Sequence, residues 1–383
     1  MAIKRNYKGN KNALVLSGGG AHAAYQVGVL SAITKFIPRN HGIPFPIICG
    51  TSAGAINATA LSCYASCFHL GVKKLEWIWK SLHTHNIYHS DPIRVLGHIS
   101  RGILGSFQAD YANKSARSLL NTEPLRDLLN QVINFDRIDN NISNGYLSAL
   151  SITASNYSTG NSISFFQSEP GIKPWFRAKR HGEPCQINSE HLMASAAIPL
   201  VFPSIKIRNQ HFGDGSVHQL SPLSPAIHLG AKRILVIGVE RPKEPVHANE
   251  NNPHPPNTAT IAGHLLDTIF SDTLKSDIER MDRINKTLSL IPKENKKNIE
   301  GLQHIDSLVL NPSHDFNAMA CEHYNELSIS VRLLLRSVGI TNDPESSIGS
   351  YLLFEKNYCN RLIKLGFEDA MIKEAQIREF LSL

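Results

Sequence analysis

The sequence predicts an α/β protein in which helices cover a mainly parallel sheet. Two units of strand, turn and helix follow one another within the first 70 residues, and a further apolar strand occurs over 232–240. Repetition of such units is typical of parallel sheets, whose crossovers are helical. With 383 residues, of which 42% are hydrophobic, the chain has enough apolar material for a large core.

The first unit is a strand over 13–17, a glycine turn and a helix over 21–36. The second is a strand over 45–50 that ends at Ser52, followed by a helix over 53–68. This second unit carries no charged side chain. Its prolines, glycines and small polar residues nevertheless favour a buried strand and helix over a membrane span.

Later segments add to the sheet and to its helical cover. Amphipathic helices are expected over 74–130, where they are candidates for a cap, and Gly160 marks the turn of a hairpin over 146–167. A catalytic domain is therefore expected over 12–240, followed by a Pro- and Asn-rich loop or linker over 241–258. The remainder, 259–383, is predicted to be a mostly helical extension with one strand over 306–312.

Charge and cysteine content limit the partners and the compartment. The net charge of +7 favours anionic partners, either lipid headgroups or nucleic acid, but no recognised nucleic-acid module accompanies the basic residues. The six cysteines form neither zinc-type pairs nor a dense disulfide framework, which favours a reducing cytoplasm. The basic start lacks the unbroken apolar run of a cleavable signal peptide, because glycines interrupt it.

The first glycine-rich stretch, "SGGGAH" over 17–22, allows three interpretations. A dinucleotide-binding loop would need an acidic residue about 20 positions later, and the first acidic residue is Glu76. The loop can instead be an oxyanion hole, because consecutive glycines let backbone N–H groups point at a developing negative charge. A simple tight turn is the third interpretation.

The second stretch, "GTSAG" over 50–54, matches the pattern G-x-S-x-G between a strand and a helix. In this context a serine stands exposed on a sharp turn, where it can act as a nucleophile. Ser52 is then the nucleophile, and the N–H of Ala53 is available to an oxyanion. Gly50 and Gly54 would allow the flanking backbones to approach closely. The alternative is a buried serine without chemistry.

The third stretch, "DGS" over 214–216, supplies a carboxylate beside Gly215. Asp-Gly is most often only a turn. Here it is the third glycine-framed stretch beside a predicted strand, and together the three offer an oxyanion hole, a nucleophile and a base. We therefore interpret Asp214 as the base that activates Ser52.

These three motifs, in this order and with "MASAAIPLVFP" (193–203) between the second and third, resemble the patatin-like phospholipases. The resemblance, to bacterial patatin-like acyl hydrolases, covers roughly residues 12–240. It implies a three-layer α/β/α fold and a Ser52–Asp214 dyad instead of a triad. It also implies an oxyanion loop formed by Gly18, Gly19 and Gly20.

The implied activity is that of a phospholipase A or lysophospholipase, which hydrolyses lipid or lysolipid acyl esters through an acyl-serine without a metal or organic cofactor. Two residues depart from the family pattern. The family commonly has Arg or Lys where this chain has His22, which leaves the role of a fixed positive charge open. Ser216 replaces the usual Gly or Ala and adds a hydroxyl near the base.

Other functions remain open at the level of sequence. An α/β-hydrolase triad would recruit His304, His314 or His323, which follow Ser52 and Asp214 in the required order. An acyltransferase would use the same acyl-serine with another acceptor, and a scaffold with an inactive site belongs to a different class. Headgroup, acyl length and oligomeric state are likewise open.

A short segment, "GIKPWFRAKRH" over 171–181, is a candidate for peripheral contact with an anionic membrane. Trp175 and Phe176 adjoin four basic residues there, and aromatic rings beside cations suit the headgroup region. The alternative is a hairpin or loop whose aromatic rings pack inward. The basic amino-terminal stretch is a second candidate for such contact.

Overall fold

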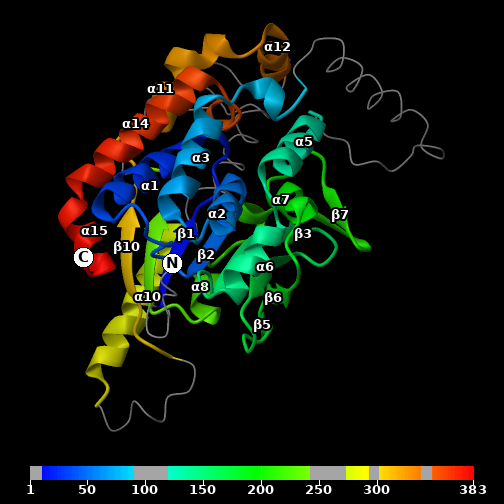
Figure 1. The fold of residues 1–383 in the computed structure, drawn as a ribbon. Coiled ribbons are helices and arrows are strands. Elements are labelled where there is room, and N and C mark those ends of the chain that lie inside the picture. Colours follow the sequence, from blue (N-terminus) through cyan, green and yellow to red (C-terminus); the bar gives the residue numbers. More distant parts are fainter. Residues whose placement is uncertain (1–10, 90–119, 200, 242–272, 293–301, 338–346) are drawn as a thin grey trace, which may run out of the picture.

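The computed structural model describes residues 11–89, 120–199, 201–241, 273–292, 302–337 and 347–383 (Figure 1). One mixed sheet runs through this part of the chain, in the order β10-β9-β1-β2-β3-β4-β6-β5. Helices lie on both faces of the sheet, which gives the predicted three-layer α/β/α arrangement. Within the described ranges no helix is long and apolar enough to cross a membrane.

Five neighbouring strands form the parallel centre of the sheet. In spatial order they are β10 (Asp306–Leu310), β9 (Arg233–Ile237), β1 (Asn12–Leu16), β2 (Ile47–Thr51) and β3 (Ala149–Asn156). Each corresponds to a strand expected from the sequence. Because parallel strands end at the same edge, the turns that follow β1 and β2 lie next to each other.

The remaining strands extend the sheet beyond β3. β4 (Asn161–Ser168) returns antiparallel to β3, which confirms the predicted hairpin, and Gly160 has a positive φ of 68° in its turn. The outer strands are β5 (Trp175–Arg177) and β6 (Arg180–Pro184), and a separate hairpin is formed by β7 (Ile205–Ile207) and β8 (Gln210–Asp214). β8 pairs antiparallel with the end of β3, so that Asp214 lies opposite Ala154.

Alternate residues of β1 enter the two cores, as expected for a sheet covered on both faces. Leu14 and Leu16 belong to the larger core, and Ala13 and Val15 belong to the smaller one. The larger core lies under α1 (Ala24–Phe36), α2 (Ala53–Cys63), α5 (Glu123–Val132), α6 (Asp136–Ser143) and α7 (Ser189–Ser195). The smaller core lies under α8 (Ser224–His228) and α10 (Thr273–Leu290).

Two helix predictions need correction at their ends. The helix expected over 53–68 is shorter in the structure, because α2 ends at Cys63. A separate helix, α3 (Phe68–Lys80), begins after a turn. The backbone of the intervening turn is bonded to another segment: Ile43 donates to Ala65, and Phe68 donates to His41. The helices expected over 74–130 are seen as the end of α3 and as α5. Their middle, 90–119, and the predicted linker 241–258 lie outside the described residues.

Five α-helices are described after residue 315. They are α11 (Phe316–His323), α12 (Ile329–Ser337), α13 (Ser347–Tyr351), α14 (Lys356–Ile372) and α15 (Glu374–Leu381), and one of them, α14, packs along α1, the first α-helix of the chain (Figure 1). A Cβ at Gly28 would collide with the carbonyl of Ile363, and one at Gly366 with that of Tyr25. Glycine at both positions therefore allows the two helix backbones to touch.

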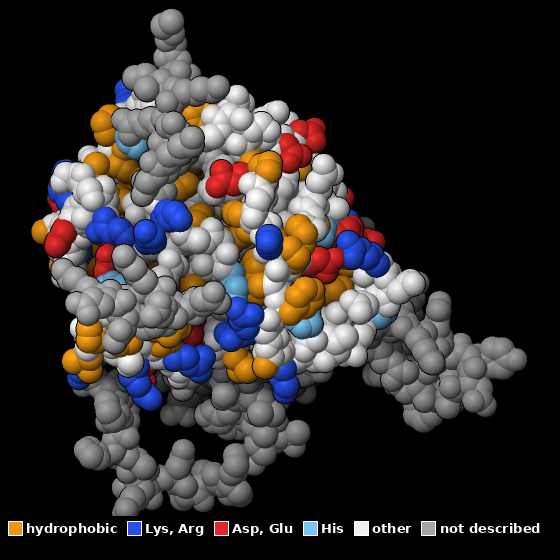
Figure 2. Space-filling view, turned by 90° about the horizontal axis from the view of Figure 1, so that it is seen from below, with side chains coloured by type: hydrophobic (Ala, Val, Ile, Leu, Met, Phe, Trp, Pro, Cys, Tyr) orange, Lys and Arg blue, Asp and Glu red, His pale blue; other side chains and the backbone are white. Residues whose placement is uncertain are grey.

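The segment 171–181 forms the β5–β6 hairpin, and its two aromatic residues differ. Trp175 is buried and stacks between Phe166 and His228, whereas Phe176 is 68% exposed. The expectation that Trp175 faces a membrane is therefore wrong. Figure 2 shows the end of the molecule where β5 and β6 lie, with hydrophobic side chains between Lys and Arg. At this end of the sheet the ring system of Trp175 therefore packs inward, against Phe166 and His228.

We predict that Trp175→Ala lowers the free energy of unfolding by about 3–5 kcal/mol, because it empties a stacked, buried site. Phe176→Ala is the matched control, since the neighbouring ring is exposed and its loss should cost less than about 0.5 kcal/mol. Chemical denaturation of both variants measures the difference. Equal stability of the two variants would contradict the packing of Trp175.

Candidate active site

Ser52 lies on a sharp turn between β2 and α2. Its φ of 55° and ψ of −130° are unusual for a residue other than glycine and store backbone strain. A Cβ at Gly50 would lie 2.5 Å from the carbonyl oxygen of Gly54, and one at Gly54 would lie 2.5 Å from that of Ser17. Gly50 therefore lets α2 begin close against β2, and Gly54 lets the turn pack against the end of β1.

A side chain from α7 holds the strained turn. The backbone N–H of Ser52 donates to Ser195 Oγ at 2.9 Å, and Ser195 Oγ in turn donates to the carbonyl of Thr153 at 2.6 Å. Ser195 is buried. Ser195 lies in the stretch 193–203, which is part of the family resemblance, but the sequence predicted no role for it. Its only sequence signal is its position inside that stretch.

Asp214 and Ser52, 162 residues apart in the chain, meet at the end of the sheet. Ser52 Oγ donates a hydrogen bond to Asp214 Oδ2 at 2.6 Å, and the backbone N–H of Ser216 donates to Oδ1 at 2.9 Å. Both side chains are buried. The pairing of β8 with β3 brings the carboxylate to this position, directly beside the end of β2.

Burial determines the proton affinity of Asp214. Removal from water disfavours the carboxylate and raises the pKa of Asp214 to about 6, although hydrogen bonds from Ser52 and from the backbone and side chain of Ser216 oppose the shift. Ser216, the departure from the family pattern, therefore stabilises the ionised form. The carboxylate is more basic than an exposed one and is still ionised at neutral pH.

The glycine loop lies directly over Ser52. A Cβ at Gly18 would lie 2.7 Å from Ser216 Oγ and 3.0 Å from Ser52 Cβ, so a side chain here would displace the Ser216 hydroxyl and crowd Ser52. Gly20 has a φ of 53° and is the first residue of the 3₁₀ helix η1 (Gly20–Ala23), as Ala53 is the first residue of α2. The N–H groups of first helical residues have no acceptor within their helix.

His22 differs from the basic residue expected in its place. It is buried between the rings of Phe316 and Tyr351, and Nε2 lies 2.9 Å from Ser350 Oγ. Burial lowers the pKa of His22 to about 3, so the imidazole is uncharged at neutral pH. This position therefore supplies no fixed positive charge, and it connects the glycine loop to α11 and α13.

An apolar cavity begins at Ser52. Its empty volume is about 700 Å³, which includes space open to solvent, and Gly20, Ser52 and Ala53 form one end. The other walls are almost entirely aliphatic or aromatic, and they come from α2, α3, α5 and the stretch after α7 (Ile56, Ala60, Leu75, Ile78, Trp79, Leu82, Leu125, Leu129, Ile198, Phe202). Walls of this composition suit contact with a hydrocarbon chain.

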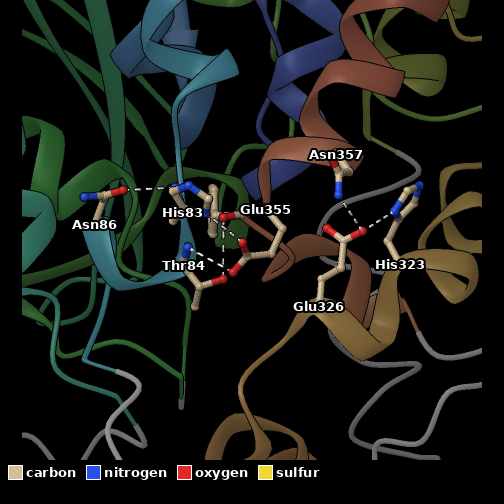
Figure 3. A network of polar contacts seen from close by, with 8 residues as sticks. His83, Thr84, Asn86, His323, Glu326, Glu355 and Asn357 are labelled. Atoms are coloured by element: carbon tan, nitrogen blue, oxygen red, sulfur yellow. Dashed lines mark hydrogen bonds and ion pairs between the residues drawn. The ribbon is translucent and has the colours of Figure 1, made fainter.

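The carboxy-terminal region completes this cavity. Phe354, directly before α14, is one of its walls. The next residue, Glu355, contacts His83 Nδ1 at 3.1 Å and accepts the backbone N–H of Thr84 at 3.3 Å (Figure 3). A second group in Figure 3 joins Glu326 to His323 and Asn357. Glu355 thereby fixes the segment after α3 that carries the wall residues Leu82 and Ile87.

The three histidines considered for a triad have other partners. His304 Nδ1 lies 3.4 Å from Asp306, His314 Nδ1 lies 2.8 Å from Ser313 Oγ, and His323 Nδ1 lies 2.8 Å from Glu326. The Ser52 hydroxyl is instead bonded to a carboxylate. Among the described residues no group of three or more His, Cys, Asp or Glu side chains could hold a metal ion.

A serine hydroxyl bonded to a buried carboxylate, at the end of an apolar cavity and beside a glycine loop, is the arrangement expected of a serine acyl hydrolase. The sequence model of the Patatin-like phospholipase family matches residues 14–227, which is more than half of the chain. The chain therefore belongs to the patatin-like phospholipase family, as its motifs predict. This family consists of lipid acyl hydrolases.

Solved structures similar to this chain include those of VipD and ExoU. The crystal structure of VipD from Legionella pneumophila has 12% sequence identity and a TM-score of 0.36, with coverage of 97% of this chain and 67% of that chain. Full-length ExoU with full-length SpcU, from the type III secretion system of Pseudomonas aeruginosa, has 15% identity and a TM-score of 0.27, with coverage of 89% and 70%. No curated protein sequence matches the chain.

Proposed function

We propose that this protein hydrolyses the acyl esters of phospholipids or lysophospholipids, with Ser52 as nucleophile and Asp214 as its only base. One observation carries the proposal: the 2.6 Å hydrogen bond from Ser52 Oγ to Asp214 Oδ2 lies at the end of an apolar cavity. A buried serine held this way already has its proton directed at the group that must accept it.

The reaction follows from this geometry. Ser52 Oγ attacks the ester carbonyl carbon while its proton moves to Asp214 Oδ2. The C–O bond to the alcohol then breaks, and the alcohol leaves with that proton. Water then loses a proton to Asp214 and attacks the carbonyl carbon of the acyl-serine. The bond from this carbon to Ser52 Oγ breaks, Asp214 returns the proton to Oγ, and the fatty acid is released. Protons balance over the cycle, so the dyad needs no further acid.

The glycine loop supplies the groups that stabilise the intermediate. We assign the oxyanion hole to the N–H groups of Gly18, Gly19, Gly20 and Ala53, because Gly20 and Ala53 both begin helices and line the same end of the cavity as Ser52. Helix N-termini favour negative charge. Donors in such a hole each contribute about 2.7–4 kcal/mol to the stability of the transition state.

The first test replaces the two members of the dyad. Ser52→Ala and Asp214→Asn should each lower kcat on a short nitrophenyl ester by roughly 10⁴-fold or more, because neither variant can form the activated nucleophile. Ser289→Ala and Asp282→Asn, both at exposed positions on α10, serve as matched controls with wild-type rates. Thermal unfolding should be nearly unchanged in all four. Substantial activity in Asp214→Asn would rule out the dyad.

The second test uses pH. Below a pH of about 6 Asp214 is protonated and accepts no proton. We therefore expect kcat/KM to fall about tenfold for each pH unit below this value and to be constant above it. Ser216→Ala removes a hydrogen bond that lowers the pKa of Asp214, so its midpoint should move to higher pH. A pH–rate profile of both proteins measures the shift. Identical midpoints would contradict the role given to Ser216.

The third test concerns the cavity. Ala60→Trp places an indole on a wall of the cavity and should lower kcat/KM for long-chain esters by at least tenfold more than for acetyl or butyryl esters, because less hydrocarbon is then buried. Asn140→Trp, at an exposed position on α6, is the control for the added ring. Equal losses for all chain lengths would show that the acyl chain lies elsewhere.

A further inference from the structure

The outer face of α3 carries apolar and basic side chains side by side. Leu70 and Trp77 are 49% and 66% exposed, and Lys73 and Lys74 are exposed between them. With 3.6 residues per turn, residues seven apart lie on one line along a helix, and the two lysines lie on either side of that line. These four residues, which we call the α3 face, therefore point in one direction.

The same helix forms a wall of the apolar cavity. Ile78, the residue after Trp77, lines the cavity together with Leu75 and Trp79, and the indole N–H of Trp79 donates to Asn57 Oδ1 at 2.8 Å. The helix itself packs beside α1, α2 and α14 (Figure 1). A surface that contacts the α3 face would thus lie within one helix diameter of the space assigned to the acyl chain.

Basic side chains continue onto the neighbouring helices. Lys74 Nζ lies 5.7 Å from the ring centroid of Tyr64, and Arg137 Cζ lies 4.2 Å from the same centroid. Within α3 the sole acidic residue, Glu76, is paired with Lys80. The α3 face is therefore positively charged and carries an exposed aromatic ring, that of Trp77, which is the composition that suits an anionic headgroup layer.

We propose that the α3 face docks on an anionic lipid bilayer, with Trp77 at headgroup level and Lys73 and Lys74 against lipid phosphates. This inference rests on the proposed action on membrane lipids. It assigns membrane contact to α3 instead of the β5–β6 hairpin, where the predicted anchor Trp175 is buried. Docking in this orientation places the cavity wall formed by Ile78 beside the bilayer from which the substrate comes.

Vesicle binding tests the proposal independently of catalysis. In a Ser52→Ala background, the triple variant Lys73→Ala, Lys74→Ala, Trp77→Ala is compared with the matched variant Lys173→Ala, Arg177→Ala, Phe176→Ala of the hairpin. Each loses two exposed basic residues and one exposed aromatic ring. Cosedimentation with phosphatidylcholine vesicles, with and without phosphatidylserine, measures partition at low and high salt.

We expect the α3 variant to lose at least thirtyfold in affinity for the anionic vesicles, since each lysine near the surface accounts for about fivefold. The hairpin variant should bind like the Ser52→Ala parent, and high salt should weaken the binding of that parent to the anionic vesicles. With Ser52 restored, the α3 variant should keep the parent rate on a soluble ester but lose activity on vesicles. Trp77→Phe should retain most of the binding.

Other outcomes overturn the proposal. Unchanged vesicle binding of the α3 variant, or equal loss in the hairpin variant, would remove α3 as the docking surface. Equal binding to neutral vesicles would exclude the role of the lysines. If the α3 variant changes only the oligomeric state in size-exclusion chromatography, the face is instead a contact between copies of this chain. If the wild-type protein binds vesicles but hydrolyses no ester, the proposed function is refuted and the docking surface stands.

Discussion

Close contact between backbones at the carboxyl ends of β1, β2 and β3 is the constraint on which the candidate site depends. Gly54 lies against the carbonyls that end β1, Gly18 lies against Ser52, and Gly215 lies against the carbonyl of Thr153 in β3. A Cβ at any of these positions would push the segments apart. Because none is present, Ser52 and Asp214 come within hydrogen-bonding distance although they belong to different strands.

The same close packing determines the electrostatics. Exclusion of water raises the pKa of Asp214, whereas the hydrogen bonds of Ser52 and Ser216 limit the shift so that the carboxylate is still charged near neutral pH. The pKa of His22 shifts in the opposite direction, because burial disfavours the charged imidazole and leaves it neutral. The region around Ser52 therefore contains the buried carboxylate of Asp214, and the N-termini of η1 and α2 lie at the end of the cavity where we propose that the oxyanion forms.

Much of this arrangement could be predicted because it is encoded locally. Strand, glycine and helix in succession predict the β1 and β2 units, and the order of three glycine motifs predicts which side chains meet. The end of α2 could not be predicted, because backbone bonds to 41–43 decide it. Burial of Trp175 depends on Phe166 and His228, which only the folded sheet brings near. The division of the chain at residues 240 and 259 stays a prediction.

The walls of the cavity could not be predicted either, since they combine residues from α2 with Phe354, about 300 residues away. Their assembly gives the carboxy-terminal helices a physical role. α14 touches α1 backbone to backbone, Glu355 holds the segment after α3, and Tyr351 packs against Gly20 and His22. The contacts of Glu355 and Tyr351 join a wall of the cavity and the glycine loop, respectively, to the region beyond residue 347. A displacement of α13 and α14 would therefore alter both the space for the acyl chain and the position of the N–H groups proposed to bind the oxyanion.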